Sequence, residues 1–301
     1  MDATADREAL ATPIDVRQLL TELSRVLATS RTVADPDAEA RELLAALLDA
    51  PRHWPTLNPG VVVQSETCSR ALGAARKRVR GAPLAYCVGA AAFRHMTLAI
   101  DERVLIPRPE TEQLVDVAMS YLGPTAGGVA VDVGTGSGAI ALALASEGRF
   151  DRVIGIDVSV DALAVARQNA QRYGDELRTV VEFRHGSLLA PVGDVRPRLV
   201  ISNPPYIANG EMASLPASVR DWEPPVALLS GSDGLRATAR LVRVAAERLC
   251  PLGVLALELD SRRAAAVGEM AWRDGRLTDV RVLRDLAGYE RFLVARRKED
   301  G

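Results

Sequence analysis

Two patterns of apolar residues divide the chain near residue 90. Before that point apolar side chains recur at helical spacing, which predicts helices over residues 14–27, 38–48 and 65–79. Asp35 followed by Pro36 is typical of a helix entry, because proline is tolerated in the first turn. Beyond residue 128, short apolar runs of strand length alternate with helical segments. We therefore expect a small helical domain over residues 1–90, followed by a domain of another class.

The stretch between these parts, residues 91–110, is expected to form a hairpin and a linker. Residues 93–100 and 104–106 are short apolar pieces, and Asp101-Glu102 between them is expected to form the turn. Prolines stiffen the loop at residues 107–110. Thr111 is expected to cap a helix that runs through residues 114–121. The second domain is therefore placed at residues 111–301.

Seven strands are expected in and around this second domain's sheet, at residues 129–133, 152–156, 180–183, 199–201, 254–259, 280–283 and 292–295. Helical patterns cover residues 137–146, 161–173 and 236–249, and Ser159 is expected to cap the second of these helices. Such alternation predicts an α/β fold with a mostly parallel sheet and helices on both faces. In open sheets of this kind, ligands bind at the carboxyl ends of the strands.

Charge and composition narrow the choice of partners. The 301 residues carry a formal net charge of −2, which argues against stable binding to nucleic acid. Three cysteines without a Cys-x-x-Cys pair and three histidines without metal-ligand spacing predict a reduced protein that binds no metal. The first ten residues lack the apolar core of a signal peptide, and Asp132 and four glycines interrupt the most apolar stretch, residues 129–145. A cytoplasmic protein without a membrane span is expected.

A glycine-rich segment, residues 132–139, reads Asp-Val-Gly-Thr-Gly-Ser-Gly-Ala between a strand and a helix. Glycines at such a junction let the backbone approach a ligand and turn into the helix. Asp157 ends the next strand, where a carboxylate can accept hydrogen bonds from ribose hydroxyls. Gly134, Gly136 and Ala139 also satisfy a dinucleotide-binding pattern, so the loop alone leaves the cofactor open. Asp132 favours S-adenosylmethionine, because the sulfonium and amino groups of that molecule are cationic.

The tetrapeptide Asn203-Pro204-Pro205-Tyr206 follows the strand expected at residues 199–201. Its prolines cannot donate to a sheet ladder, so they lie beyond the end of that strand. Asn203 offers a side-chain carbonyl, Pro204 a backbone carbonyl and Tyr206 a flat aromatic face. Two acceptors and an aromatic wall suit a planar –NH2 group, as in an amide or the exocyclic amine of a base. The structural alternative is a proline-rich turn with a capping asparagine.

With both motifs present, the chain resembles the class I methyltransferases that act on planar amino nitrogens. Within that group it is similar to the HemK-type protein-glutamine N(5)-methyltransferases. The most specific stretch is Val-Leu-Ile-Pro-Arg-Pro-Glu-Thr-Glu at residues 104–112, and residues 81–86, 222–235 and 285–288 resemble further segments of that family. The resemblance runs from about residue 80 to residue 295. It implies a Rossmann-like, S-adenosylmethionine-dependent domain with a seven-stranded, mostly parallel sheet, preceded by a helical domain that recognises the substrate.

The resemblance also implies a role for individual residues. S-adenosyl-L-methionine would be bound by Asp132, Gly134, Thr135, Gly136, Ser137, Gly138, Asp157, Ser187, Leu188 and Asn203. The glutamine amide would be held by the expected catalytic residues Asn203, Pro204, Pro205 and Tyr206, with Arg108, Pro109 and Glu110 shaping the substrate channel. That glutamine would belong to the Gly-Gly-Gln motif of peptide chain release factors, and the enzyme would act as a monomer. Ser187 and Leu188 replace the acidic and aromatic pair that the family commonly places against adenine, so a weaker stacking contribution is expected.

Four other functions remain open from the sequence. A ribosomal-protein glutamine methyltransferase would share the catalytic loop and differ in the docking surface of residues 1–80. An adenine or cytosine amino-methyltransferase would use the same acceptors, but the near-neutral charge and the linker at residues 107–110 count against it. An NAD-dependent oxidoreductase would need an acid or base to handle hydride transfer, and no histidine lies in the right region. A non-catalytic module could retain the cofactor pocket alone.

Overall fold

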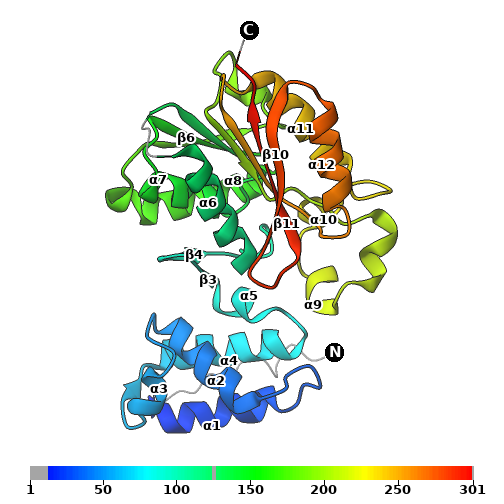
Figure 1. Ribbon diagram of the computed structural model, residues 1–301. Coiled ribbons are helices and arrows are strands. Elements are labelled where there is room, and N and C mark those ends of the chain that lie inside the picture. Colours follow the sequence, from blue (N-terminus) through cyan, green and yellow to red (C-terminus); the bar gives the residue numbers. More distant parts are fainter. Residues whose placement is uncertain (1–12, 124–126, 300–301) are drawn as a thin grey trace. The chain divides into compact units, whose positions relative to one another are not determined.

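The computed structural model describes residues 13–123 and 127–299, and its internal contacts divide the chain into two units (Figure 1). One unit comprises the described residues up to Ala90 together with Pro216–Trp222. The other comprises Ala91–Leu215 and the described residues from Glu223 onward. Each unit has its own hydrophobic core.

The first unit is helical. Its elements are β1 (Ile14–Asp15), α1 (Val16–Leu27), α2 (Pro36–Leu47), α3 (Trp54–Leu57), β2 (Val62–Val63), α4 (Ser65–Val79) and α5 (Leu84–Val88). Asp15 and Gln18 form a capping box at the start of α1, where both satisfy backbone donors that the helix cannot. Asp35 accepts a hydrogen bond from the backbone of Ala38 at the start of α2, with Pro36 in the first turn as expected.

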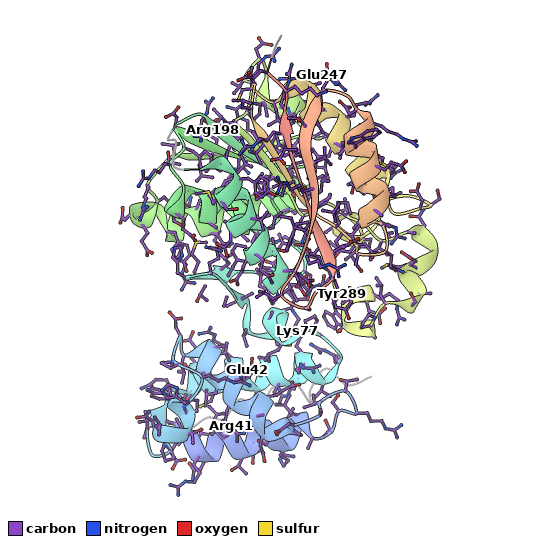
Figure 2. All side chains as sticks on the ribbon, in the orientation of Figure 1. Arg41, Glu42, Lys77, Arg198, Glu247 and Tyr289 are labelled. Atoms are coloured by element: carbon purple, nitrogen blue, oxygen red, sulfur yellow. The ribbon has the colours of Figure 1, made fainter. Side chains whose placement is uncertain are left out.

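Leucine side chains fill the centre of this helical unit. Leu19, Leu23 and Leu43 are fully buried among α1, α2 and α4, as helical spacing predicts. The separate segment Pro216–Trp222, which contains α9 (Ala217–Arg220), also belongs to this unit. The ammonium group of Lys77 (labelled in Figure 2) lies 5.7 Å from the ring centroid of Trp222. Nothing in the local sequence pattern indicates this association.

The second unit contains a seven-stranded sheet in the order β10-β11-β9-β8-β5-β6-β7, which confirms the expected mostly parallel sheet. The strands are β5 (Val129–Val133), β6 (Arg152–Asp157), β7 (Val181–His185), β8 (Leu199–Ser202), β9 (Val254–Glu258), β10 (Leu277–Arg284) and β11 (Glu290–Arg297). Strands β7, β6, β5, β8 and β9 run parallel, and β11 pairs antiparallel with both β9 and β10. The inner strands β5, β8 and β9 are mostly apolar and buried, and their polar residues Asp132, Ser202 and Glu258 lie at or near the carboxyl ends.

Helices cover both faces of this sheet (Figure 1). Helices α6 (Pro109–Leu122), α7 (Ala139–Glu147) and α8 (Val160–Arg172) lie on one face, and α11 (Arg236–Arg248) and α12 (Ala264–Arg273) lie on the other. Shorter elements are the 3-10 turns η1 (Gly174–Glu176), η2 (Ala190–Val192) and η3 (Asn209–Ser214), and the helix α10 (Pro225–Leu228). Among the described residues, no helix has both the length and the apolar character that a membrane span requires.

The expected hairpin is present, but its turn was placed wrongly. Strands β3 (Ala90–Phe93) and β4 (Met96–Ala99) are joined at Arg94, whose φ of 55° is left-handed, and not at Asp101-Glu102. The guanidinium of Arg94 donates to Glu147 at 2.6 Å and to Asp116 at 2.8 Å. These distant partners fix the turn, and a local pattern cannot show them.

Thr111 was also expected in the wrong role. Helix α6 begins at Pro109, with Arg108 as its N-cap residue, so Thr111 lies inside the first turn. Its hydroxyl donates a 2.7 Å hydrogen bond to Glu258 at the end of β9. The hydroxyl therefore serves a tertiary contact and not the capping of the helix.

Candidate active site

A cavity of about 300 Å³ lies in the second unit, at the carboxyl edge of the parallel strands. The predicted site residues that line it are Gly134, Gly136, Asp157, Ser187, Leu188, Asn203, Pro204 and Pro205. The rest of its wall includes residues that sequence reasoning did not single out for the site, among them Val104, Leu105, Ile156, Ala162, Ala227, Arg240 and Leu241. Two motifs that lie about 70 residues apart in the sequence therefore meet at one cavity.

The glycine loop leaves open space beside its backbone. Gly134 has a φ of +75° and Gly136 a φ of +55°, and at both positions an added Cβ would meet no atom within 4 Å. The backbone N–H groups of Gly134 and Thr135 both donate to the carbonyl of Ile156, at 2.8 and 2.9 Å, which ties the loop to β6. A ligand can therefore lie directly against this loop, because no side chain covers it.

Asp132 lies beneath the loop and not in the cavity wall. It is fully buried, and its Oδ2 accepts hydrogen bonds from the Thr135 hydroxyl at 2.6 Å and the Ala141 backbone at 3.1 Å. Its Oδ1 has no hydrogen-bond partner among the described residues. Burial raises the pKa of Asp132 to about 7, because desolvation outweighs both hydrogen bonds. A buried carboxylate with one unsatisfied oxygen gives this side of the site an acidic character that suits a cationic ligand.

The other predicted loop residues, Thr135, Ser137 and Gly138, also do not line the cavity. Thr135 and Ser137 are buried, and the backbone carbonyl of Ser137 accepts a hydrogen bond from Asn169 on α8. Gly138 precedes α7 at a φ of +84°, and a Cβ there would come within 3.3 Å of Ala166 and of Phe183. These residues support the shape of the loop from below.

Asp157 ends β6 and faces the cavity. Its Oδ2 accepts from the backbone of Gly136 at 2.9 Å, and its Oδ1 accepts from the backbone of Ser159 at 2.9 Å. Each carboxylate oxygen can accept more than one hydrogen bond, so both can still receive hydroxyl donors. Ser187 and Leu188, after β7, complete this part of the wall, with Leu188 at a left-handed φ of 54°.

Asn203 follows β8 and is held by a chain of hydrogen bonds. Its Nδ2 donates to Thr111 Oγ1 at 3.1 Å, and Thr111 Oγ1 donates to Glu258 Oε2 at 2.7 Å. Within residues 13–123 and 127–299, Asn203 Oδ1 accepts no hydrogen bond, and the atom is not fully buried. Since Asn203 lines the cavity, this oxygen is available to a ligand there. The carbonyl of Pro204 likewise accepts no hydrogen bond within the same residues.

Thr111 and Glu258 are the site residues that sequence reasoning missed. Glu258 is the last residue of β9, and a carboxylate at the carboxyl end of a parallel strand is a usable signal. Burial raises its pKa to about 7, and the hydrogen bond from Thr111 opposes that rise. Tyr206 is partly buried outside the cavity wall, and burial raises the pKa of its phenol to about 12.

Arg108, Pro109 and Glu110 lie at the start of α6, outside the cavity wall. The guanidinium of Arg108 donates to both oxygens of Glu223, at 2.6 and 2.7 Å. The Glu223 side chain is only 1% exposed, and its burial raises the pKa of this carboxyl despite the nearby arginine. Arg108 therefore joins the start of α6 to the segment that precedes α10.

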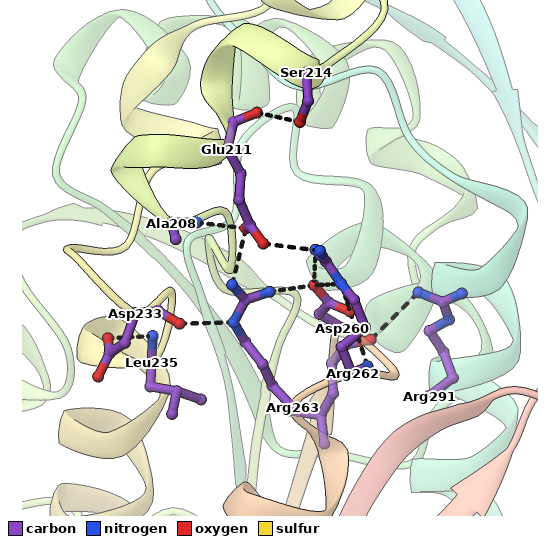
Figure 3. A network of polar contacts seen from close by, with 10 residues as sticks. Ala208, Glu211, Ser214, Asp233, Leu235, Asp260, Arg262, Arg263 and Arg291 are labelled. Atoms are coloured by element: carbon purple, nitrogen blue, oxygen red, sulfur yellow. Dashed lines mark hydrogen bonds and ion pairs between the residues drawn. The ribbon is translucent and has the colours of Figure 1, made fainter.

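A second polar cluster fixes the chain just beyond Tyr206 (Figure 3). Glu211 in η3 accepts from Arg262 and from Arg263, each at 2.8 Å, and both arginines also pair with Asp260 after β9. The side chain of Glu211 also accepts from the backbone of Ala208 at 3.0 Å. These contacts connect the loop after the Asn-Pro-Pro-Tyr sequence to the residues that follow β9.

The sheet order, the open glycine loop and the acceptors after β8 define a class I methyltransferase. A family model described as the methyltransferase small domain matches residues 112–217, and one described as the PrmC N-terminal domain matches residues 18–89. The chain is 38% identical to a release factor glutamine methyltransferase of Moorella thermoacetica, over 95% of this chain and 99% of that one. It is 37% identical to the enzyme of that name in Deinococcus radiodurans, over 94% and 99%. The chain belongs to the release factor glutamine methyltransferase family.

A comparison of structures supports the fold alone. The catalytic domain of hMettl16, solved in complex with the MAT2A 3′UTR hairpin 6, superposes with a TM-score of 0.54 at 17% identity. The match covers 80% of this chain and 86% of that one. The protein is a methyltransferase, and its methyl donor is S-adenosylmethionine.

Proposed function

We propose that this enzyme transfers a methyl group from S-adenosylmethionine to the side-chain amide nitrogen of the glutamine in the Gly-Gly-Gln motif of peptide chain release factors. The observation that carries the proposal is the orientation of the Asn203 side chain. Its Nδ2 donates to Thr111, and its Oδ1 is available to accept a hydrogen bond from a ligand in the cavity. Relatives aligned over nearly the whole chain bear the name of this activity. The docking surface for the release factor is assigned to the helical domain, residues 1–90.

The residues around the cavity fit the cofactor. Gly134 and Gly136 would lie against its methionine part, with Thr135, Ser137 and Gly138 holding the loop and Asp132 supplying negative charge behind it. Asp157 would accept the two ribose hydroxyls, and Ser187 and Leu188 would contact the adenine. Leucine offers packing without the stacking of an aromatic ring, so the adenine contact contributes less than a ring would.

The chemical problem is that an amide nitrogen is a poor nucleophile, because its lone pair is delocalised into the carbonyl. When bound, S-adenosylmethionine supplies an electrophilic methyl group on a sulfonium. Asn203 Oδ1 and the Pro204 carbonyl would each accept one N–H of the glutamine amide and so aim its nitrogen at that methyl group. As the N–C bond forms and the S–C bond breaks, positive charge that develops on nitrogen would be stabilised by acceptors already in place, and the nitrogen would then release one proton to water. Alignment of the two reactants contributes about 7–11 kcal/mol, and one preorganised polar contact about 3–4 kcal/mol.

The remaining predicted residues would shape the substrate channel. Pro205 would stiffen the loop that carries the two acceptors, and Tyr206 would stack against the glutamine amide. Arg108, through its pair with Glu223, and Pro109 and Glu110 would form the approach to the cavity. We further assign the enzyme to the cytoplasm as a monomer without stable nucleic-acid binding, in keeping with its net charge of −2 and a substrate that works in translation.

The test uses S-adenosylmethionine labelled in its methyl group. The purified enzyme is incubated with a purified class I release factor, and in parallel with the same factor carrying alanine in place of the Gly-Gly-Gln glutamine. Label is expected on the wild-type factor only. Label on both proteins would show that the methylated residue is not the Gly-Gly-Gln glutamine. Label on neither factor, together with label on purified ribosomal protein, would assign the enzyme to ribosomal-protein methylation.

A further inference from the structure

Two consecutive hydrogen bonds link the side-chain amide of Asn203 to Thr111 and then to Glu258. We propose that Thr111 and Glu258 are positioning residues that hold the Asn203 amide with its oxygen toward the cavity. This inference rests on the proposed function, in which that oxygen accepts an N–H of the substrate amide. The two residues come from different elements: Thr111 from the first turn of α6 and Glu258 from the end of β9. Only 5% of Thr111 and 2% of Glu258 is exposed, so water does not compete freely for these contacts.

The direction of the chain follows from its proton count. An ionised carboxylate has no proton, so at Glu258 it can only accept, and the Thr111 hydroxyl must donate to it. That hydroxyl has no second proton, so toward Asn203 it can only accept, and the partner atom must be the amide nitrogen. The oxygen of Asn203 is then left pointing to the cavity. A turned amide would have nearly the same shape but would present a donor to the donors of the substrate.

A purely structural role does not account for this carboxylate. Of the four other buried acids of the second unit, Glu223, Asp260 and Asp285 each form an ion pair with an arginine, and the fourth, Asp132, lies beneath the glycine loop of the site. Within the described residues, Glu258 has no ion pair within 4 Å, and its side chain accepts a hydrogen bond from the neutral hydroxyl of Thr111. A buried carboxylate of this kind costs stability, whereas an apolar side chain would pack there without that cost. Its acceptor-only chemistry explains why a carboxylate is useful at this position.

The same chain predicts sensitivity to pH. A protonated Glu258 can donate to Thr111 Oγ1, which frees the threonine proton to donate to Asn203 Oδ1 and allows the amide to turn. Burial raises the pKa of Glu258 to about 7. The charged and titratable groups that face it are Arg108 and Glu110 at the start of α6, Arg291 on β11, and Tyr206 after β8. Of these, Arg108 and Arg291 favour the ionised form and Glu110 disfavours it. Turnover should therefore rise with pH through about 7 and level off above it.

The test compares Thr111→Val, which keeps the shape and removes the hydroxyl, with Thr111→Ser, which keeps the hydroxyl. With release factor as acceptor at saturating S-adenosylmethionine and pH 8, Thr111→Val should lower kcat roughly 10- to 100-fold. Its Kd for S-adenosylmethionine should stay within about threefold of wild type, and Thr111→Ser should keep kcat within about threefold. Glu258→Gln retains an acceptor but cannot ionise, so it should lose the rise of kcat near pH 7. A Thr111→Val enzyme with wild-type kcat, or a Thr111→Ser enzyme equally impaired, would overturn the proposal.

A second readout needs no substrate and so separates this inference from the proposed function. The chain has four asparagines, at positions 58, 169, 203 and 209, and selective ¹⁵N labelling of asparagine gives four side-chain NH2 signals. The Asn203 signal is assigned as the one lost in Asn203→Ala. It should shift between pH 6 and pH 8 in wild type, shift similarly in Thr111→Ser and be insensitive to pH in Thr111→Val. If wild type does not methylate the release factor, the proposed function fails and these signals still decide the positioning role. A pH-dependent shift that persists unchanged in Thr111→Val would refute it.

Discussion

Asn203 Nδ2 lies 3.1 Å from Thr111 Oγ1, although 92 positions separate the two residues in the sequence. The contact joins the loop after β8 to the first turn of α6 and leaves the amide oxygen of Asn203 unengaged within the described residues. In the same loop, the Pro204 carbonyl provides a second acceptor. Because it belongs to the backbone, it has no side-chain rotamers. A loop of two prolines therefore presents two acceptors with little freedom to lose on binding.

Replacement of Asn203 by alanine tests the central acceptor. Asn203→Ala should lower kcat about 100- to 1000-fold, because one preorganised acceptor at the reacting nitrogen is lost. The Kd for S-adenosylmethionine should change far less, since the glycine loop and Asp157 remain intact. The measurement pairs steady-state methyl transfer at saturating cofactor with calorimetric titration of the cofactor. Unchanged turnover in this variant would remove Asn203 from the mechanism.

Strands and the Asn-Pro-Pro-Tyr junction were accessible from the sequence because they depend on local pattern. β5 spans the residues that were expected, and β8 ends one residue later than expected, before the two prolines. Apolar runs bounded by glycine and proline leave few alternatives in an α/β chain. Seven strands and a mostly parallel sheet followed from the same reasoning.

Side-chain partnerships were not accessible, because they depend on which elements meet in space. The turn at Arg94 is fixed by Glu147, 53 residues away, and Thr111 is engaged by Glu258, 147 residues away. Helix α12 was missed although its buried residues lie at helical spacing, and the segment Pro216–Trp222 gave no sign that it joins the helical unit. The position of Asn203 and Pro204 at the edge of the sheet was therefore predictable, whereas the hydrogen-bond partners of the Asn203 side chain were not.

The buried Asp132 should make stability depend on pH. Its pKa is about 7 in the folded chain and 3.8 in the reference state, so between these values the folded form holds a proton that the unfolded chain has released. The contribution of this group to stability is fully present below about pH 4 and is lost as pH rises through 7. Asp132→Asn cannot ionise and avoids this loss. The free energy of unfolding of Asp132→Asn minus that of wild type should therefore be larger at pH 8 than at pH 4.5, by on the order of 2–4 kcal/mol.

Urea unfolding of both proteins at the two pH values, without cofactor, measures this difference. A difference that does not change with pH would show that Asp132 is ionised throughout. At pH 8 wild-type Asp132 is mostly ionised, and its Oδ1 has no partner among the described residues. Asp132→Asn removes this negative charge, so it should also bind the cationic S-adenosylmethionine more weakly than wild type at that pH.

Variants of the ion pair between Arg108 and Glu223 can distinguish a structural role of Arg108 from a role in substrate approach. Arg108→Met leaves the buried Glu223 carboxylate without its partner, and Arg108 itself is 31% exposed in the wild type. We expect the free energy of unfolding to fall by about 1–3 kcal/mol at pH 8, less than for a fully buried pair. The loss should shrink as the pH falls, because Glu223, whose pKa burial already raises, accepts a proton more readily than a free carboxylate.

The double variant Arg108→Met with Glu223→Gln is the control, since it removes the unpaired charge. It should recover most of the stability that Arg108→Met loses. If methyl transfer recovers with stability, the pair is structural. Transfer that stays low in a stable double variant would assign Arg108 to the substrate channel, as proposed.

The glycine loop permits a comparison of two positions with nearly the same backbone geometry. Gly134 has a φ of +75° and Gly275, in the turn between α12 and β10, a φ of +78°, and an added Cβ would meet no atom within 4 Å at either position. Alanine should therefore cost both variants a similar amount, roughly 1–2 kcal/mol of unfolding free energy, through the strain of a left-handed φ. Only Gly134 lines the cavity, so only Gly134→Ala places a methyl group where the cofactor would lie. Calorimetric titration should show S-adenosylmethionine affinity at least about tenfold lower for Gly134→Ala and unchanged for Gly275→Ala. Equal affinities in the two variants would place the cofactor away from this loop.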